Sequence, residues 1–344
     1  MSSNKLSPSE ISQNEDSGKH IENKINSMME SVASVLIIFI STYFILITPS
    51  LVEMHTFLSN HQIKVNLFEY FWTVVGALLS FALYKFSTTT LITLWSPFIS
   101  PVIVRHNEST EQRVHRLGDY IYKTIYYTWS WCTLMYMTYG SIFSPSEFGG
   151  QLDIEKSLEV WPYEVNLSVR IFYMLTLGHH FERLAFELMH NRKASSFFTM
   201  TFHHLVTVML IFLSFYTRHL MFGIPILLTH DFNDIFLNAC RFWRESLFPT
   251  SASVAFMIMM ISWFYTRIFM YAKYVLYGLL FNMLHLSEFV RRFFFVQLFF
   301  VPALLALFIL NLFWFFQIFR VFVWRFVKKD KNLPFEDFKT KKNK

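Results

Sequence analysis

Long apolar segments alternate with short polar connections along most of the chain. A membrane-crossing helix needs roughly 20 mostly apolar residues, and eight segments reach or approach that length. They cover residues 31–51, 66–95, 121–143, 165–188, 196–216, 219–240, 252–272 and 298–324. The sequence lacks the alternating ten-residue strands of an outer-membrane barrel, which leaves helices as the structure that satisfies its backbone in lipid. The pattern therefore predicts an all-α integral membrane protein with about eight transmembrane helices.

The composition agrees with this pattern. Hydrophobic residues make up 53% and aromatic residues 19% of the 344 positions, which leaves too little polar surface for a soluble globule of this size. Both cysteines, Cys132 and Cys240, fall in predicted spans, so neither a disulfide framework nor a thiolate zinc site is expected. Residues 1–30 are polar and lack the apolar core of a signal peptide, so we expect a disordered cytosolic tail.

Lysine and arginine indicate which side of the membrane each connection faces, because short cytosolic loops are enriched in them. The connections 101–120, 189–195 and 241–251 are basic, whereas 144–164 is acidic. Eight spans with both termini in the cytosol fit this distribution.

The C-terminal tail, residues 327–344, is strongly basic and ends in Lys341, Lys342, Asn343 and Lys344. Lysines third and fourth from the end resemble the dilysine retrieval signal of endoplasmic reticulum membrane proteins, which works only on the cytosolic side. This ending predicts a multi-pass protein of the endoplasmic reticulum membrane.

Polar side chains recur at helical spacing inside three consecutive spans. Steps of three and four residues place one set on a single face of the fourth span: Tyr173, Thr176, His180, Arg183 and Glu187. The fifth span carries His203, His204, Thr207 and Ser214, and the sixth carries His230, Asp231, Asp234 and Asn238. The connections are short, so these helices are antiparallel neighbours and their polar faces can meet in a common cavity. Arg183 and Glu187 are also spaced so that they can form an ion pair.

The ionisable groups of the three spans lie at one depth. At a rise of 1.5 Å per residue they lie roughly 9–14 Å from the cytosolic helix ends. A buried aspartate costs about 2.5–3.5 kcal/mol even on the most lenient insertion scale. One intramembrane histidine is often only hydrogen-bonded between helices, but five such groups together favour a functional site. These five are His203, His204, His230, Asp231 and Asp234.

Residues 202–243 resemble the Lag1 motif of ceramide synthases. That motif has paired histidines, a threonine three residues later, a serine followed by an aromatic residue, a glycine, a His-Asp pair and a second aspartate. The matching residues here are His203, His204, Thr207, Ser214, Phe215, Gly223, His230, Asp231 and Asp234. The chain departs from the family at Arg218 and Met221, which stand where the family usually has Asn and Arg.

The surrounding chain is similar to the TRAM/LAG1/CLN8 (TLC) domain over about 113–326. This resemblance implies that the last six transmembrane helices form a TLC-type bundle around a central cavity. Residues 31–112 would then hold two further transmembrane segments and a cytosolic linker.

The family resemblance implies an enzyme that transfers a fatty acyl group from acyl-CoA to the amine of a sphingoid base such as sphinganine. It implies no metal and no cofactor, with acyl-CoA as a co-substrate. The partners implied are acyl-CoA, the sphingoid base, membrane lipids and further copies or relatives of the chain in a homo- or hetero-oligomer, and no nucleic acid. The expected catalytic residues are His203, His204, His230, Asp231 and Asp234, and the expected substrate-binding residues are Tyr173, His180, Arg183, Thr207, Ser214 and Asn238.

The residue types suit this reaction in two ways. An imidazole, with an unperturbed pKa of about 6.5, can remove a proton from the substrate ammonium while a carboxylate orients the ring. Alternatively, His203 or His204 takes the acyl group first and passes it to the amine. The sequence leaves both routes open.

Two other functions account for the pattern less well. A membrane hydroxylase or desaturase would need many histidines at wider spacings, whereas this chain has adjacent pairs. A non-enzymatic TLC-domain protein for lipid sensing, lipid trafficking or translocon association would commonly lack the complete set of paired histidines, His-Asp and second aspartate.

Overall fold

The computed structural model describes residues 48–60, 63, 66–98, 109–159, 161–162, 164–191, 196–245, 249–279 and 293–323. The chain divides into two units, Met1–Met54 and His55–Lys344, and every helix of the candidate site belongs to the second. The tail 1–30, most of the first predicted span and the dilysine ending lie outside the described residues.

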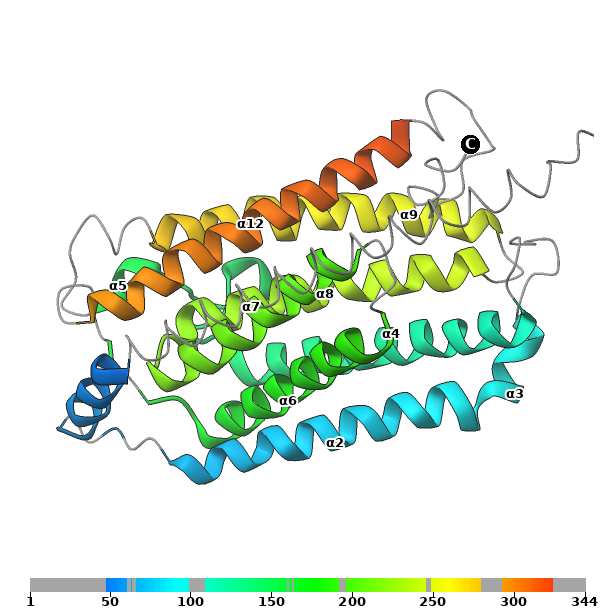
Figure 1. Cartoon of the computed structure of the whole chain (residues 1–344). Helices are drawn as coiled ribbons and strands as arrows, with labels where there is room; N and C mark the ends of the chain where they lie inside the picture. The colour runs from blue at the N-terminus through cyan, green and yellow to red at the C-terminus, as the bar shows by residue number, and fades with distance from the viewer. Residues whose placement is uncertain are drawn as a thin grey trace, which may run out of the picture. The chain divides into compact units, whose positions relative to one another are not determined.

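The described regular structure is helical, without a strand in these ranges. The long elements are α2 (Phe71–Lys85), η2 (Phe86–Thr90), α4 (Thr110–Thr138), α6 (Leu167–His190), α7 (Phe197–Tyr216), α8 (Leu220–Glu245), α9 (Pro249–Trp263), η5 (Phe264–Leu276) and α12 (Phe294–Phe322). Short turns occur at η1 (Leu67–Tyr70), α3 (Ile92–Trp95), η3 (Ser96–Phe98), η4 (Ser146–Phe148) and α5 (Ile154–Glu159). The long helices run alongside one another, with α7 and α8 between the pair α4 and α6 and the pair α9 and α12 (Figure 1).

Five helical segments of the described chain are long and apolar enough to cross a membrane. They are Phe68–Thr90, Phe197–Tyr216, Leu220–Glu245, Ser251–Leu279 and Phe299–Phe322. The helices α4 and α6, with 29 and 24 residues, are long enough but more polar, because part of their surface lines a buried cavity. The fold class is therefore confirmed as an all-α, multi-pass membrane protein, and the count of eight spans stays a prediction.

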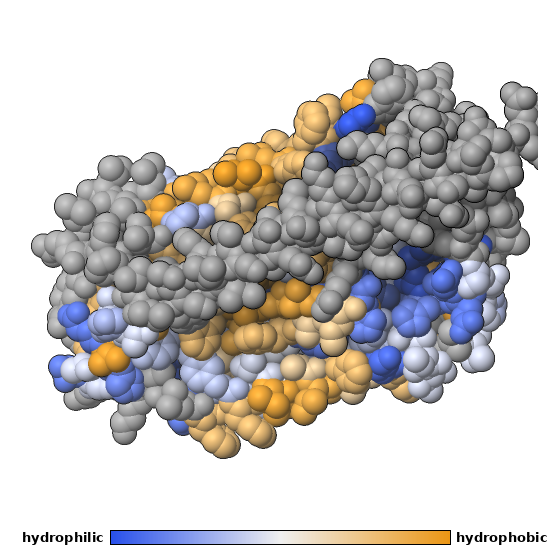
Figure 2. Space-filling model, in the orientation of Figure 1, coloured by the Kyte–Doolittle hydropathy of each residue, from blue (hydrophilic) through white to orange (hydrophobic). Residues whose placement is uncertain are grey.

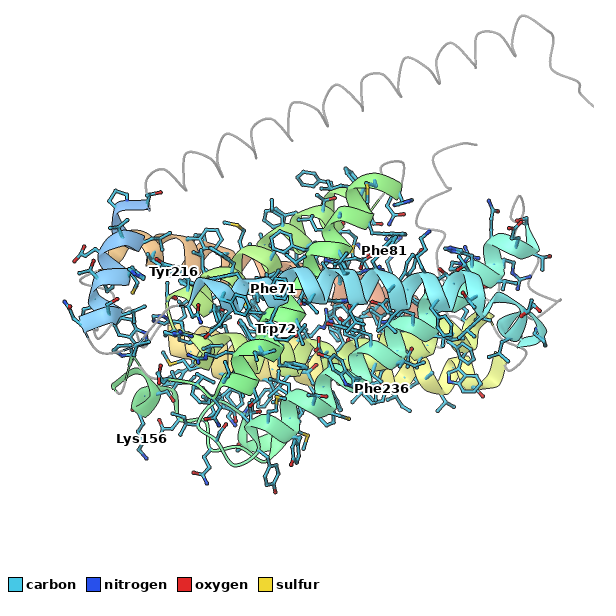
Figure 3. All side chains as sticks on the ribbon, turned by 90° about the horizontal axis from the view of Figure 1, so that it is seen from below. Phe71, Trp72, Phe81, Lys156, Tyr216 and Phe236 are labelled. Carbon is cyan, nitrogen blue, oxygen red and sulfur yellow. The ribbon has the colours of Figure 1, made fainter. Side chains whose placement is uncertain are left out.

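Apolar side chains cover the surface that such a protein presents to lipid. On α2, Phe71 and Phe81 are 52% and 50% exposed, and Figure 3 shows both along this helix. Figure 2 shows hydrophobic residues over the middle of the helices and hydrophilic residues toward their ends.

Two glycines let α2 approach α6 closely. A methyl group at Gly76 would lie 2.3 Å from the carbonyl oxygen of Leu175, and one at Gly178 would lie 2.1 Å from that of Thr73. Small residues commonly allow such backbone contact between membrane helices, so α2 is held directly against the outer side of α6.

The helix that contains most of the third predicted span begins before that span. One continuous helix, α4, begins at Thr110, eleven residues before the predicted start of the span at residue 121. Ser109 Oγ accepts a hydrogen bond from the backbone N–H of Gln112, and Gln112 Oε1 accepts one from that of Ser109. This capping box satisfies the first backbone donors, so the helix starts well before the apolar run.

Hydrogen bonds join the acidic connection between α4 and α6 to η5. This contact lies at the end of the helices opposite the basic connections. Glu147 accepts hydrogen bonds from Lys273 Nζ at 2.8 Å and from the hydroxyl of Tyr274. Burial acts to raise the pKa of Glu147, but these two hydrogen bonds lower it below the usual value. The carboxylate therefore stays charged at neutral pH, and its contacts with Lys273 and Tyr274 keep the connection against η5.

Candidate functional site

A cavity of about 400 Å³ lies among α4, α6, α7, α8, the continuous helix α9–η5 and α12. Its volume falls in the range of small-molecule sites, roughly 300–1,000 Å³. All eleven residues that the sequence singled out as catalytic or substrate-binding line this cavity. They are Tyr173, His180, Arg183, His203, His204, Thr207, Ser214, His230, Asp231, Asp234 and Asn238. The three polar helix faces therefore meet in one space, as their spacing predicted.

The imidazoles of His203 and His204 stand side by side on α7. Their ring centroids are 5.4 Å apart, and the ring of Trp314 from α12 lies 5.2 Å from His203 at a nearly perpendicular angle. Both Nδ1 atoms are buried, and neither has a hydrogen-bond partner among the described residues. The two Nδ1 atoms are therefore not hydrogen-bonded to any described side chain. This suits groups that must accept a proton from a substrate or form a bond to it.

His230 is held differently from this pair. Its Nδ1 lies 2.8 Å from the carbonyl oxygen of Ile226, and its Nε2 lies 3.3 Å from Nδ2 of Asn311. Because a carbonyl only accepts, Nδ1 carries the proton and the lone pair of Nε2 receives the amide N–H of Asn311. Both nitrogens of His230 are therefore occupied, and this geometry suits positioning better than proton transfer.

Each aspartate has a partner on another helix. Asp231 accepts a 2.6 Å hydrogen bond from Ser130 Oγ on α4. Asp234 forms an ion pair with Arg267 of η5, and the same Nη2 lies 3.3 Å from the carbonyl oxygen of His230. In the described ranges no hydrogen bond joins either carboxylate to His203 or His204, so the expected carboxylate–imidazole contact is absent. The physical reason is that α4 and η5 supply competing donors to both carboxylates.

Three of these partners were missed by sequence reasoning: Ser130, Arg267 and Asn311. They lie on α4, η5 and α12, outside the motif. A signal was present for two of them, because a lone arginine in "FYTRIFM" and a lone asparagine in "LFILNLFW" are costly in lipid. Ser130 carried no such signal, because serines in membrane helices are common and usually form a hydrogen bond to the backbone of their own helix.

Arg183 pairs with Glu182 instead of Glu187. Its Nε and Nη2 donate to the two oxygens of Glu182 at 2.5 Å, whereas Glu187 accepts from Asn191. Both glutamates are buried, so each needs a polar partner, and Asn191 supplies the one for Glu187. Lys123, whose Nζ lies 2.6 Å from Asp119, brings a second cation to the same wall of the cavity.

The cavity reaches the surface where the basic ends of α4 and α8 lie together. Arg241 is exposed and lines the opening together with Arg244. Behind them, the fully buried Glu245 lies 3.8 Å from both Arg113 and Arg116 and 3.2 Å from Arg244. We call Arg241 and Arg244, where they line the cavity, the mouth; with Arg113, Arg116 and Glu245 beside it, this end has an excess of positive charge that would attract an anionic ligand.

No cluster of three or more His, Cys, Asp or Glu side chains suited to a metal ion is found in the described ranges. The polar lining consists instead of imidazoles, carboxylates and cations separated by apolar wall. Such a set can bind an anionic group at the mouth and an apolar chain in the interior, and it can move protons between them.

Comparison with known proteins identifies the family. The TLC domain model, named for TRAM, LAG1 and CLN8, matches residues 116–320. Ceramide synthase LOH2 of Arabidopsis thaliana is 24% identical over 187 residues, which are 54% of this chain and 61% of that protein. Ceramide synthase 4 of Mus musculus is 30% identical over 164 residues, which are 47% of this chain and 40% of that protein. Ceramide synthase hyl-2 of Caenorhabditis elegans is 24% identical over 221 residues, which are 62% of this chain and 65% of that protein.

The matched region thus spans less than two thirds of the length of each of these three relatives. The domain match alone nevertheless covers more than half of the present chain, including all or most of each of the six helices around the cavity. The three relatives named above are ceramide synthases, and the chain belongs to the TLC-domain family.

Proposed function

We propose that this protein is a ceramide synthase that transfers a fatty acyl group from acyl-CoA to the amine of a sphingoid base. The observation that carries the proposal is the single cavity lined by all eleven expected residues. Their assembly from three helices gives one space lined by four imidazoles, two carboxylates and an apolar wall. A purely structural set of polar residues has no need to converge on an open cavity.

The reaction forms an amide bond between the substrate nitrogen and the thioester carbon, and it breaks the carbon–sulfur bond of acyl-CoA. The ammonium form of the base must lose protons, and the departing thiolate takes one up. His203 or His204 can carry a proton between them, because their Nδ1 atoms have no partner among the described residues. The same availability suits a route in which an imidazole nitrogen first becomes acylated and CoA leaves before the amine attacks.

The basic mouth would bind the phosphates of CoA. Arg241 and Arg244 line the opening of the cavity, and guanidinium groups recognise phosphates through paired, charge-assisted hydrogen bonds. Acyl-CoA is supplied from the cytosol, so the proposal places this mouth on the cytosolic side of the endoplasmic reticulum membrane. Both chain termini would then face the cytosol.

The proposed reaction is tested with purified protein, sphinganine and a panel of acyl-CoA lengths, with the N-acyl product identified by mass spectrometry. We expect amide formation with at least one acyl-CoA, above the level of protein-free membranes prepared in parallel. Failure to form amide with any acyl-CoA and with either sphinganine or sphingosine, by a folded preparation, contradicts the proposal. A further mixture of protein and acyl-CoA without the base distinguishes the two routes, because only the covalent route releases CoA and leaves acylated protein.

Substitution Arg241→Gln is expected to raise the KM for acyl-CoA about tenfold, equivalent to about 1.4 kcal/mol, with little change in kcat. The guanidinium would contact the phosphates alike in the bound substrate and in the transition state, so its loss affects binding. The measurement is initial rate against acyl-CoA concentration at low and high salt. Lys156→Gln is the matched control, since Lys156 is an exposed cation on α5, away from the cavity lining. An Arg241→Gln enzyme with unchanged KM would remove Arg241 from the CoA site.

A further inference from the structure

The helix α2 lies outside the matched domain, which begins at residue 116, yet it packs along α6 beside the cavity (Figure 1). No described residue of α2 lines the cavity. The buried residues of this helix are Gly76, Ser80 and Tyr84, which are four positions apart and therefore share one face. Because Gly76 allows a close approach to α6, the short side chain of Ser80 reaches groups on both α4 and α6.

The hydroxyl group of Ser80 has three hydrogen-bond partners. Its Oγ lies 3.1 Å from Oε2 of Glu182 on α6. It also lies 2.8 Å from the hydroxyl of Tyr122 on α4 and 2.8 Å from Nδ1 of His179 on α6. A carboxylate only accepts, so Ser80 donates its single proton to Glu182 and accepts from the other two groups. The hydroxyl cannot turn away from Glu182 without leaving a buried donor unpaired.

Glu182 transmits this constraint to Arg183. Its Oε2 accepts from both Ser80 and Nε of Arg183, and its Oε1 accepts from Nη2. The guanidinium lies 4.9 Å from the ring centre of Tyr84, and its Nη1 lies 3.6 Å from Oδ1 of Asp119. Two residues of α2 therefore orient Arg183: Ser80 acts through Glu182, and Tyr84 acts directly.

The charges around Arg183 are arranged with the cations toward the cavity. Arg183 and Lys123 line the cavity, whereas their partners Glu182 and Asp119 do not. This wall therefore presents positive charge, which favours anions and electron-rich oxygens and repels ammonium groups. It suits acyl-CoA, which has phosphates and carbonyl oxygens, better than the ammonium group of a sphingoid base.

Arg183 lies at about the depth of the paired histidines. It stands seven residues before the end of α6 at His190, and His204 stands seven residues after the start of α7 at Phe197. Each is thus about 10 Å from its helix end. The two helices pack together, and only residues 191–196 separate them in the chain. A shift of Arg183 would therefore change the cavity close to the expected reacting groups.

We infer that Ser80 is a positioning residue for acyl-CoA binding, because it fixes the carboxylate of Glu182 and through it the guanidinium of Arg183 at the cavity wall. The inference rests on the proposed function, since it takes acyl-CoA as the ligand that Arg183 meets. It also means that a helix outside the TLC domain completes the site within that domain.

The test measures kcat and the KM for each substrate in full-length variants. Ser80→Ala should raise the KM for acyl-CoA about fivefold, the scale of one hydrogen bond, because Glu182 and Arg183 can then shift together. The kcat and the KM for sphinganine should change by less than about twofold, since Arg183 would contact acyl-CoA alike in the bound complex and in the transition state. Loss of folded protein alone would instead lower the apparent kcat at constant KM.

Ser87→Ala is the matched control. Ser87 is a second buried serine, about 10 Å further along the same helix, and it donates to the carbonyl oxygen of Gly118 on α4 at 2.9 Å. This variant also loses a hydrogen bond between helices, but its KM for acyl-CoA should equal that of the wild type. An equal rise in KM would mean general loosening of the helices and would overturn the inference.

A combined substitution tests whether Ser80 acts through Arg183. Glu182→Gln with Arg183→Met removes both charges of the pair, so neither is left unpaired, and it should raise the KM for acyl-CoA by at least about tenfold. Adding Ser80→Ala to this background should have no further effect, because the guanidinium that it positions is absent. A further rise in KM would overturn the inference. A folded background without activity would give Arg183 a role in the chemical step and would overturn it too.

A folded Ser80→Ala variant with an unchanged KM for acyl-CoA contradicts the inference directly. If Ser80→Ala does not fold, Ser80→Cys decides the question, because a thiol has nearly the same shape but is a weak donor and a weak acceptor. Its KM for acyl-CoA should rise, and an unchanged value counts against the inference in the same way. A wild type that acylates nothing contradicts the proposed function instead, so the two failures are distinguishable.

Discussion

Replacing both His203 and His204 by alanine is expected to reduce acyl transfer by roughly 10²–10⁴-fold, the usual contribution of a positioned acid–base group. Both rings line the cavity, and neither Nδ1 has a hydrogen-bond partner among the described residues. Their removal therefore orphans no known polar partner, and folding should be largely preserved. The measurement is amide formation from acyl-CoA and sphinganine in membranes that contain equal amounts of wild-type or variant protein.

The control for this experiment is His190→Ala, since His190 is an exposed histidine at the end of α6 and does not line the cavity. It should retain wild-type activity. The single variants His203→Ala and His204→Ala show whether one ring dominates, as expected of a nucleophile. Transfer by the double variant within about tenfold of the wild-type rate would contradict the role of both imidazoles, since it falls well short of the usual contribution of a positioned acid–base group.

Substitution Arg267→Ala should destabilise the protein by up to about 3 kcal/mol. This is the lower end of the range for breaking a buried ion pair, and we choose it because 20% of the Asp234 side chain is exposed. It leaves the Asp234 carboxylate in the membrane interior without its cation. It also removes the hydrogen bond to the carbonyl oxygen of His230. We expect a lower thermal unfolding temperature in detergent together with loss of acyl transfer.

The double variant Arg267→Met with Asp234→Asn separates stability from activity. Replacing both charges with uncharged groups of similar size removes the unpaired carboxylate, so the unfolding temperature should recover most of its loss. Acyl transfer should stay absent if Asp234 takes part in the reaction. Recovery of activity along with stability would assign the pair a structural role alone.

Much of the site could be predicted from sequence because helical periodicity is local. Residues three and four positions apart share a face of a helix whatever surrounds it, so the polar faces of α6, α7 and α8 were identifiable. Their short connections then required the helices to be neighbours. The high cost of polar groups in lipid made convergence of these faces the expected outcome.

The connections between side chains could not be predicted in the same way. Spacing alone allowed an ion pair between Arg183 and Glu187, but the adjacent Glu182 binds Arg183 instead. The partners of His230 and Asp234 come from α12 and η5, more than 30 residues away along the chain. Such pairs depend on which helices pack together and at what height, and no local pattern encodes that.

The sequence by itself determined the class of protein, the helices and the residues that face the cavity, because hydropathy and helical period act over a few turns. Tertiary structure alone decided which imidazoles remain available, which carboxylates are already bound and what supports the cavity wall. It did so because each of these depends on a contact between helices: Ser130 to Asp231, Asn311 to His230, and Ser80 to Glu182. The chemistry of the site therefore depends on residues both within and outside the motif that identifies it.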